Sequence, residues 1–280
     1  MKCLPLFSER GPGLSALLFW LFLGVLFPAP GNAGDNRITN EIGMTFIKVL
    51  PGNFVMGSPL NERLRNKDEQ QHSVTITSAY YLQETEVTVR QWQAVMGKKW
   101  LSRHKGSPDM PVTRVCWYNT MKYVKKLNQK SKWTYRLPTE EEWEYACRAG
   151  STTAYSWGDG IDCSKAMFAN NTKKDKECTL FYKSLGIPPN GPAPVKSFAP
   201  NAWGFYDMHG NVWEWCADVY AEYLSGPVSS TYSTMDVDSR VRRGGSWYKH
   251  AQYLRSANRT YGHPSAKFRT TGFRLVLEAN

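Results

Sequence analysis

The chain of 280 residues lacks the features of several protein classes. After residue 33 it has no apolar run long enough to cross a bilayer, which takes about 20 residues in a helix. It has no low-complexity tract, no internal repeat and no linker rich in proline and serine. Hydrophobic residues make up 41%, which provides enough apolar material for a packed core and excludes a disordered chain. The 22 glycines and 16 prolines argue against a coiled coil.

Acidic residues are scarce relative to basic ones, with 24 Asp and Glu against 35 Lys and Arg, so the formal net charge is +11. This excess suits anionic partners such as polysaccharides, phospholipid headgroups or acidic peptides. Because the basic residues are scattered along the chain, a solvated basic surface is the simpler explanation. A peptide, a protein or a small molecule stays open as the ligand, and the sequence gives no indication of the oligomeric state.

Residues 1–33 have the organisation of a secretory signal. The parts are, in order, a basic start, an apolar run, two helix breakers and a small-residue cleavage motif: Lys2 and Arg10, Leu14 to Phe27, Pro28 and Pro30, and Gly31-Asn32-Ala33. A membrane anchor is the alternative, but an apolar run of 14 residues falls short of the roughly 20 that span a bilayer. We therefore expect cleavage after Ala33 and an exported protein, periplasmic or secreted, with residues 34–280 as one domain. Export argues against nucleic acid as a partner.

Five cysteines remain after the predicted cleavage, and an odd number leaves at least one thiol unpaired within the chain. Cys163 and Cys178 bracket a polar stretch, and we predict a disulfide between them. Cys116, Cys147 and Cys216 lie in apolar patterns, which predicts buried thiols that act as small hydrophobic residues.

The pattern predicts an α+β domain. Short strands are expected at 45–49, 53–56, 73–77, 80–84, 240–247 and 272–277. Helices are expected at 88–97, 117–129 and 139–150. Capping boxes open two of them, with Thr88 before Gln91 and Thr139 before Glu142. The run Glu140 to Glu142 suits the positive helix end, which favours capping over acid/base catalysis. The long loops after residue 150 must be held by packed tryptophans, buried arginine networks or metal ions.

Several segments carry a resemblance to a known family. They are YRLPTEEEWEYA at 135–146, NAWGFYDMHGNVWEW at 201–215 and RVRRGGSW at 240–247, with shorter matches at 52–58 and 272–274. In this order they resemble the formylglycine-generating enzyme, or sulfatase-modifying factor, family over nearly the whole mature chain. The resemblance implies that family's variant of the C-type-lectin-like fold, in which a small twisted sheet is surrounded by long ordered loops.

The resemblance also implies a structural calcium ion. Residues 207–218 hold four oxygen-bearing side chains, those of Asp207, Asn211, Glu214 and Asp218, and oxygen ligands suit this hard cation. The family's ligands correspond to the carboxylates of Asp207 and Glu214 and the backbone carbonyls of Gly210 and Val212. From spacing alone, Asp207 could instead cap a helix.

A second calcium site of the family corresponds to Asn170 and the carbonyl of Asn171. The region that should supply an aspartate reads Gly186-Ile187-Pro188-Pro189 instead. Without that carboxylate, the sequence argues against the second ion.

The family's oxidation chemistry needs two cysteines shortly after the Gly-Gly-Ser motif, because soft thiolates select copper(I). The matching positions here are Lys249 and, allowing for a short deletion, Leu254, and no cysteine follows Cys216. An ammonium group and an alkyl chain cannot replace two thiolates, so we do not expect copper.

The neighbouring candidate pocket is retained in sequence. Trp213 and Ser246 match residues that line the family's active site, Arg259 matches an arginine near its substrate groove, and His250 follows the lost first cysteine. A structural role for these residues explains their presence as well. The histidines His209, His250 and His263 lack a spacing that suggests a metal site.

Three functions remain. The first is an exported, calcium-stabilised domain that binds a peptide or partner without copper-dependent cysteine oxidation. The second is an oxidoreductase with non-cysteine chemistry in the same pocket, similar to the family's pyoverdine-maturation oxidases. The third is a true formylglycine-generating oxidase, which the missing cysteines disfavour most.

Overall fold

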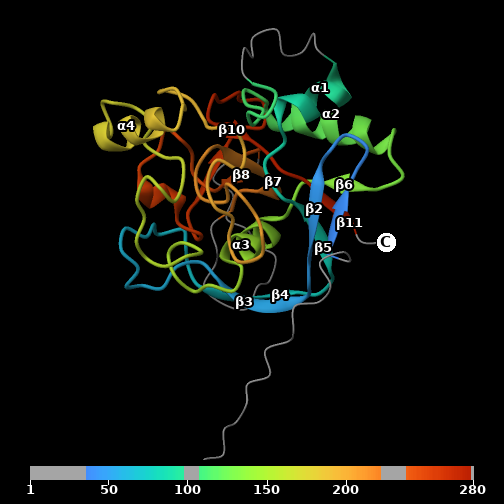
Figure 1. Ribbon diagram of the computed structural model, residues 1–280. Helices are drawn as coiled ribbons and strands as arrows, with labels where there is room; N and C mark the ends of the chain where they lie inside the picture. The colour runs from blue at the N-terminus through green and yellow to red at the C-terminus, as the bar shows by residue number, and fades with distance from the viewer. Residues whose placement is uncertain (1–35, 98–106, 222–237, 279–280) are drawn as a thin grey trace, which may run out of the picture. The chain divides into compact units, whose positions relative to one another are not determined.

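The structure is a computed structural model that describes residues 36–97, 107–221 and 238–278, so the expected secretory segment lies outside the described residues. Contacts join the described residues into one compact unit. Its helices, two β-sheets and a two-stranded ribbon confirm the α+β prediction (Figure 1). Within the described residues, no helix combines the length and the apolar character needed to cross a membrane.

Five strands form the first sheet, in the order β1-β2-β5-β11-β6, and every neighbouring pair is antiparallel. The strands are β1 (Arg37–Thr39), β2 (Thr45–Val49), β5 (Tyr80–Gln83), β6 (Tyr135–Arg136) and β11 (Val276–Glu278). β11 follows all the others in sequence, yet it lies between β5 and β6.

Four strands form the second sheet, in the order β10-β7-β8-β9. They are β7 (Trp213–Val219), β8 (Arg240–Arg243), β9 (Arg259–Gly262) and β10 (Thr271–Gly272). β10 runs parallel to β7, and the other pairs are antiparallel. Two further strands, β3 (Gly52–Met56) and β4 (His72–Ile76), pair as a separate ribbon.

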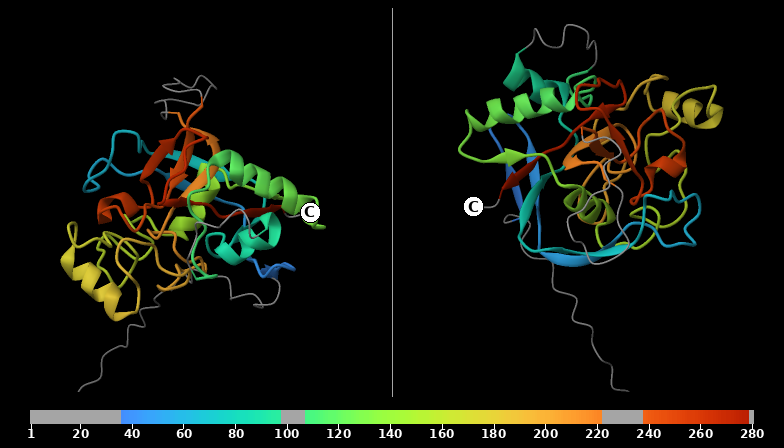
Figure 2. Two further views of the ribbon diagram at one scale, coloured as in Figure 1. Left: turned by 90° about the horizontal axis from the view of Figure 1, so that it is seen from above. Right: turned by 180° about the vertical axis from the view of Figure 1, so that it is seen from behind.

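The helices lie against these sheets. They are α1 (Val89–Met96), α2 (Trp117–Asn128), α3 (Glu140–Arg148), α4 (Lys176–Ser184) and the short 3₁₀ helix η2 (Ala251–Leu254). α1 and α2 pack on each other, and α2 contacts β6. α3 contacts β7 and β8 as well as the ribbon, and the view from behind in Figure 2 shows it between them. Both predicted capping boxes, at Thr88 and Thr139, are present.

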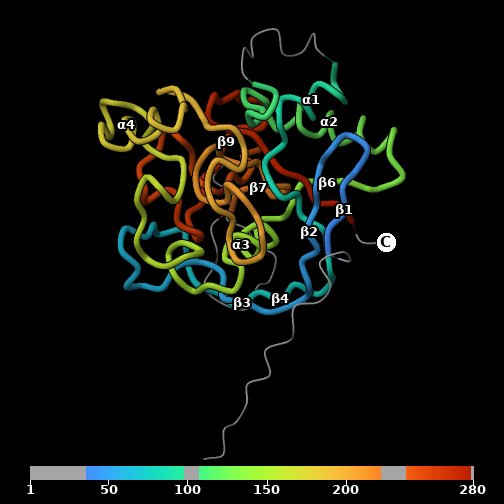
Figure 3. Tube along the Cα trace, in the orientation of Figure 1, coloured from blue at the N-terminus to red at the C-terminus, as the bar shows by residue number. Residues whose placement is uncertain are grey.

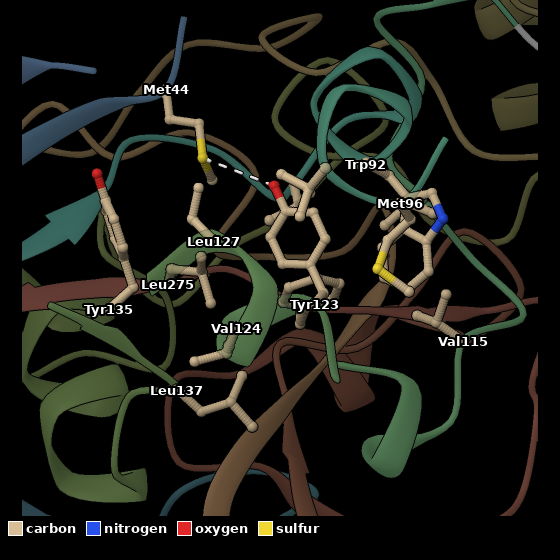
Figure 4. Close-up of a cluster of buried hydrophobic side chains, with 14 of the residues drawn as sticks. Met44, Trp92, Met96, Val115, Tyr123, Val124, Leu127, Tyr135, Leu137 and Leu275 are labelled. Atoms are coloured by element: carbon tan, nitrogen blue, oxygen red, sulfur yellow. Dashed lines mark hydrogen bonds between the residues drawn. The ribbon is translucent and has the colours of Figure 1, made fainter. Parts of the chain in front are cut away.

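One apolar cluster fills the space between the first sheet and the α1–α2 pair (Figure 4). Trp92 stacks on Tyr123 with ring centroids 5.2 Å apart, and Phe273 meets both rings edge-on. The Tyr123 hydroxyl reaches the sulfur of Met44 at 3.8 Å. Large aromatic side chains therefore join α1, α2 and the last strands of the chain into one core.

The predicted strand at 272–277 is in fact two short strands of different sheets. β10 belongs to the second sheet and β11 to the first, and residues 273–275 cross between them. In the crossover, the carbonyls of Phe273 and Leu275 accept the backbone N–H groups of Val87 and Gln83. These hydrogen bonds hold the crossing segment against the β5–α1 connection.

The structure differs from the sequence prediction in three further respects after α3. Figure 3 shows that residues between α3 and β7 are mostly loop, with α4 as a regular element that the sequence pattern did not predict. The pattern also did not predict β7 and β9. β8 ends at Arg243, four residues short of its predicted end, because Gly244 and Gly245 adopt φ of +94° and +79°, which a strand cannot continue.

Cysteine pairing agrees with the sequence. Cys163 and Cys178 form a disulfide that ties the start of α4 to the preceding loop, with their Cα atoms 5.2 Å apart. Cys116, Cys147 and Cys216 are free and buried. Both cysteine predictions are confirmed.

Buried arginines hold the long loops, as expected from their length. Each arginine lies in one segment and its carboxylate partner lies in a distant one: Arg243 with Glu144, Arg255 with Glu69, Arg259 with Glu140, and Arg274 with Glu214. Arg274 is fully buried in the crossover, and it also donates to the carbonyls of Gln83, Glu84 and Tyr206. A single side chain thus joins the crossover, β7, the β5–α1 connection and the loop before β7.

Replacing Arg274 with lysine is expected to lower the free energy of unfolding by about 3–5 kcal/mol, because an ammonium group cannot form the two-pronged pair and also reach these carbonyls. Chemical denaturation followed by circular dichroism measures the change. Arg90→Lys is the matched control, since Arg90 pairs with Asp109 while both side chains are more than half exposed. Its loss should stay within about 1 kcal/mol. Equal losses in the two variants would contradict a central role for Arg274.

The start of α3 depends on a carboxyl group from β7. Asp218 accepts the backbone N–H of Glu140 at 2.7 Å. Burial, together with the charges of Glu141 and Glu140, raises the pKa of Asp218 to about 7. Because this value exceeds that of the unfolded chain, about 3.9, the native state binds the proton more tightly. The resulting stabilisation is complete at low pH and is lost as the pH rises through 7.

Asp218→Asn is therefore expected to raise the melting temperature by a few degrees at pH 8, where the native carboxylate carries an unfavourable charge, and to change it little near pH 4.5. The asparagine oxygen can still accept the same N–H. Scanning calorimetry at both pH values measures the difference, with the exposed Asp109→Asn as the control. A stabilisation that is the same at both pH values would contradict the assignment.

Candidate functional site

Glu214, a calcium ligand by the resemblance, is fully buried in β7 and is held by its neighbours. Arg274 donates from Nε to Oε2 at 2.7 Å and from Nη2 to Oε1 at 2.8 Å. The indole N–H of Trp143 donates to Oε2 at 2.8 Å. Both oxygens of Glu214 therefore accept hydrogen bonds from protein donors, and its charge is compensated by Arg274.

Asp207 lies in the turn that leads into β7, with a left-handed backbone at φ +59°. One carboxylate oxygen, Oδ2, accepts the backbone N–H of Lys196 at 2.9 Å. In the same turn, Asn211 accepts the N–H of Ala193 at 2.9 Å. A helix-capping role for Asp207 is wrong, because the segment after this turn is a strand.

The structure adds a carboxylate that the sequence did not single out. Glu86 is fully buried in the β5–α1 connection, and neither of its side-chain oxygens has a hydrogen-bond partner in the described part of the chain. Asp207 is close enough for its negative charge to raise the pKa of Glu86. The only hint in the sequence is an acidic residue just before the helix cap Thr88, because Asp207 is far away along the chain.

Burial sets the protonation of this pair. It raises the pKa of Glu86 well above its usual range, and the charges of Asp207 and Glu214 act in the same direction. It also raises the pKa of Asp207 to about 6, against the N–H of Lys196 and the charge of Arg274. Two such carboxyl groups favour sharing a proton or a cation.

The charges around Arg274 fit a divalent cation. Glu86, Asp207 and Glu214 carry three negative charges when ionised, and Arg274 compensates one of them. In the residues that the structure describes, no three His, Cys, Asp or Glu side chains converge as a metal-binding group. A cation beside Glu86 and Asp207 would therefore need backbone carbonyls as well, which is an ordinary ligand set for calcium.

At the second calcium site, hydrogen bonds join the two loops, while the side-chain oxygen of Asn170 is buried without a hydrogen-bond partner among the described residues. The side-chain amide of Asn170 donates to the carbonyls of Pro188 and Gly191, each at 2.9 Å. Asn171 donates to the side chain of Asn190 at 2.5 Å. These amide donors join the two loops without a carboxylate.

The candidate pocket residues lie on opposite faces of the second sheet. Cross-strand register aligns Glu214, Arg243 and Arg259, and Arg259 forms a two-pronged pair with Glu140 of α3 at 2.6 and 2.9 Å. Trp213 is offset by one residue from Glu214, so its side chain lies on the other face. Arg259 is thus held inside the fold on the α3 side, away from Trp213.

The other face carries an arginine with aromatic neighbours. The guanidinium carbon of Arg242 lies 4.2 Å from the ring centroid of Phe268, 5.4 Å from that of Trp215 and 6.0 Å from that of Trp213. Ser246 follows shortly after β8, and it is fully buried. The structure therefore groups Trp213 with Arg242 on the sheet face opposite α3.

The three histidines have separate surroundings. His209 is buried, with Nδ1 donating to the carbonyl of Leu254 at 2.7 Å, and burial lowers its pKa to about 4. His250 is exposed at the start of η2, and His263 is exposed beside Ser265. Burial also raises the pKa of the Cys147 thiol to about 12, although Cys147 lies 3.6 Å from Nε2 of His209.

Known proteins resemble this chain along most of its length. A formylglycine-generating enzyme of Streptomyces coelicolor is 31% identical over 210 residues, which cover 68% of this chain and 61% of the relative. The mouse formylglycine-generating enzyme is 29% identical over 88% of this chain and 63% of its own length. The bovine inactive C-alpha-formylglycine-generating enzyme 2 is 30% identical over 79% of this chain and 64% of its own length. The chain spans about three fifths of the length of these curated relatives.

Solved structures share the fold. PvdO from Pseudomonas aeruginosa superposes with a TM-score of 0.72 and 26% identity, over 87% of this chain and 98% of that chain. Treponema denticola variable protein 1 gives a TM-score of 0.71 and 26% identity, over 87% of this chain and 99% of that chain. These likenesses confirm the expected formylglycine-generating-enzyme variant of the C-type-lectin-like fold.

The model of the sulfatase-modifying factor enzyme 1-like domain matches residues 35–279. This match includes both sheets, the carboxylate cluster around Arg274 and the loop that follows β8. The chain belongs to the sulfatase-modifying factor enzyme 1-like family.

Proposed function

We propose that this chain is an exported, calcium-stabilised domain that binds a peptide or another partner, and that it does not carry out copper-dependent cysteine oxidation. The binding region that we assign is the loop after β8, next to Trp213 and Ser246. The disulfide between Cys163 and Cys178 supports export, since such bonds form and persist in oxidising compartments.

The observation that carries this proposal is the chemistry of the loop after β8. The position that matches the first copper cysteine is Lys249, and all cysteines of the chain precede it. The three free thiols are buried, and burial raises the pKa of Cys147 and Cys216, which keeps them protonated. Copper(I) binds thiolates, so these thiols are poor substitutes.

The similarity to a relative named as inactive agrees with a binding role. The bovine protein of that name is about as similar to this chain as the enzymes of the family. An oxidoreductase that uses non-cysteine chemistry in the same pocket is the outcome that would replace our proposal.

For calcium, we assign Glu86 and Asp207 as carboxylate ligands, with the carbonyls of Gly210 and Val212. The two partnerless oxygens of Glu86 support this assignment, because a buried carboxylate without a donor is costly. Glu214 holds Arg274 beside the ion and contributes to the negative charge. We assign no ion to the Asn170 and Asn171 region.

Calcium is expected to raise the melting temperature of the mature protein by several degrees, since an ion at about 100 times its dissociation constant stabilises the fold by about 2.7 kcal/mol. Scanning fluorimetry in chelator and in calcium measures the shift. Glu86→Gln and Asp207→Asn should each reduce it strongly, because each removes a charged ligand.

Asp162→Asn is the control, since Asp162 is exposed and bonds only with nearby Ser164. This variant should respond to calcium like the wild type. An unchanged melting temperature in calcium, with no heat of binding by calorimetry, would refute the calcium site and leave the ligand-binding role to be judged separately.

The proposal also predicts no conversion of cysteine to aldehyde. Mature protein with copper(I), oxygen and a Cys-x-Pro-x-Arg peptide should give no more aldehyde than a sample without protein, as read by mass spectrometry. A genuine formylglycine-generating enzyme run in parallel shows that the conditions work. Conversion by this chain would mean that other ligands hold copper and would overturn the proposal.

A further inference from the structure

Positive charge concentrates beside the loop that follows β8. We define the basic surface by four residues, Lys174, Tyr248, Lys249 and Arg269. The Lys174 ammonium lies 4.3 Å from the ring centroid of Tyr248, and the guanidinium carbon of Arg269 lies 5.2 Å from the same centroid. Two cations from segments far apart in sequence thus meet at one exposed tyrosine.

Backbone hydrogen bonds fix this arrangement. The N–H of Ala169 donates to the carbonyl of Lys249 at 2.8 Å, and that of Asn170 donates to Trp247 at 2.8 Å. The strand-like pairing brings the segment before α4, which carries Lys174, against the loop after β8. Figures 1 and 2 both show α4 next to the segment around η2.

None of the cations on the basic surface has a carboxylate partner among the described residues. Every ion pair of the described part of the chain involves other basic groups. The neighbouring acid in sequence, Asp175, accepts the N–H of Cys178 at the start of α4. This differs from the rest of the fold, where buried arginines pair with glutamates.

A buried cation lies behind the basic surface. Arg242 is 9% exposed, and among the described residues its guanidinium donates only to Thr271 and the carbonyl of Tyr261, while its Nε has no partner there. Burial lowers the pKa of Lys249, and the charges of Lys174 and Arg242 lower it further, so these groups repel one another.

Two donors in the same loop also lack acceptors. The hydroxyl of Ser246 and the indole N–H of Trp247 are buried, and neither has a hydrogen-bond partner in the described residues. Arg269 lies over the Trp247 ring, with its guanidinium carbon 4.9 Å from the centroid. The surplus positive charge at the surface of this loop calls for a ligand that is anionic and rich in acceptors.

We propose that the basic surface binds a tetrahedral oxyanion, a phosphate or sulfate group, on the ligand of the loop after β8. This inference rests on the proposed binding role and names the chemistry of its ligand. Lys174, Lys249 and Arg269 supply the charge, and Arg242 adds a positive field from behind. A phosphate monoester carries nearly two negative charges and a sulfate ester carries one, and each presents three terminal acceptor oxygens to several cations, where a carboxylate presents two.

Unpaired cations cost stability, as functional sites commonly do. Lys249→Met removes the ammonium group that is repelled by Lys174 and Arg242. This variant should therefore fold with a melting temperature equal to or slightly above that of the wild type in chloride. This variant therefore separates loss of binding from loss of folding.

The test uses full-length mature protein and isothermal titration calorimetry at constant ionic strength. The probes are inorganic phosphate, inorganic sulfate and acetate, with chloride as the background. Phosphate and sulfate should bind more tightly than acetate. Lys249→Met should weaken their binding about fivefold, Lys249→Arg should retain most of it, and the exposed Lys130→Met should match the wild type.

A second set of titrations distinguishes phosphate from sulfate, with glucose 6-phosphate and glucose 6-sulfate as probes. The probe with the lower dissociation constant indicates the group that the natural ligand carries. Equal binding of all anions, or equal binding by the wild type and Lys249→Met, would overturn the inference. If the oxyanion inference fails but the cysteine peptide is not converted to aldehyde, the proposed binding function still stands. Aldehyde formation would instead refute the proposed function itself.

Discussion

Paired charges in the interior are the constraint on which the rest of this fold depends. Between α3 and β7 the chain is mostly loop, and buried ion pairs act together with an apolar cluster to hold the loops after α3. Arginines from β8, β9, the end of η2 at Arg255 and the sheet crossover reach glutamates in α3, β7 and the loop after β3. Breaking any of these pairs would leave a charge without a partner in a dry interior. The glutamates at the start of α3 thus do more than complement a helix dipole.

The sequence could predict features that arise from neighbouring residues. The capping boxes at Thr88 and Thr139 and the disulfide between Cys163 and Cys178 depend on local spacing, and each is present. β7 was missed because its alternating Trp and acidic residues resemble a metal-binding turn. Glu86 was missed because its environment is made by Asp207 and Arg274, which only folding brings near it. Trp213 and Arg259 lie on opposite faces of the second sheet because of the strand register, which the sequence alone does not reveal.

The two faces of the second sheet have excess charge of opposite sign. On the α3 side, arginines and glutamates compensate one another, and the remaining excess near Arg274 is negative. On the other side, Arg242 has aromatic neighbours and no acid, and the loop beyond it carries an excess of positive charge. Both excesses lie close to the Gly-Gly-Ser segment at residues 244–246. The buried ion pairs that hold the fold and the cations of the loop after β8 are different residues. The ligand of that loop can therefore change while the buried ion pairs stay the same.

The position of β11 has a consequence for the order of folding. This strand is the last of the described strands in sequence, yet it lies between β5 and β6 in the first sheet and follows directly on the crossover that carries Arg274. Until residues 271–278 are in place, β5 and β6 have no strand between them, and Glu214 lacks the guanidinium of Arg274. Early segments can form helices, but the sheet cannot close around them. The contacts of β11 join residues that are far apart in sequence. We therefore expect slow folding, in which both sheets are completed together in one late cooperative step.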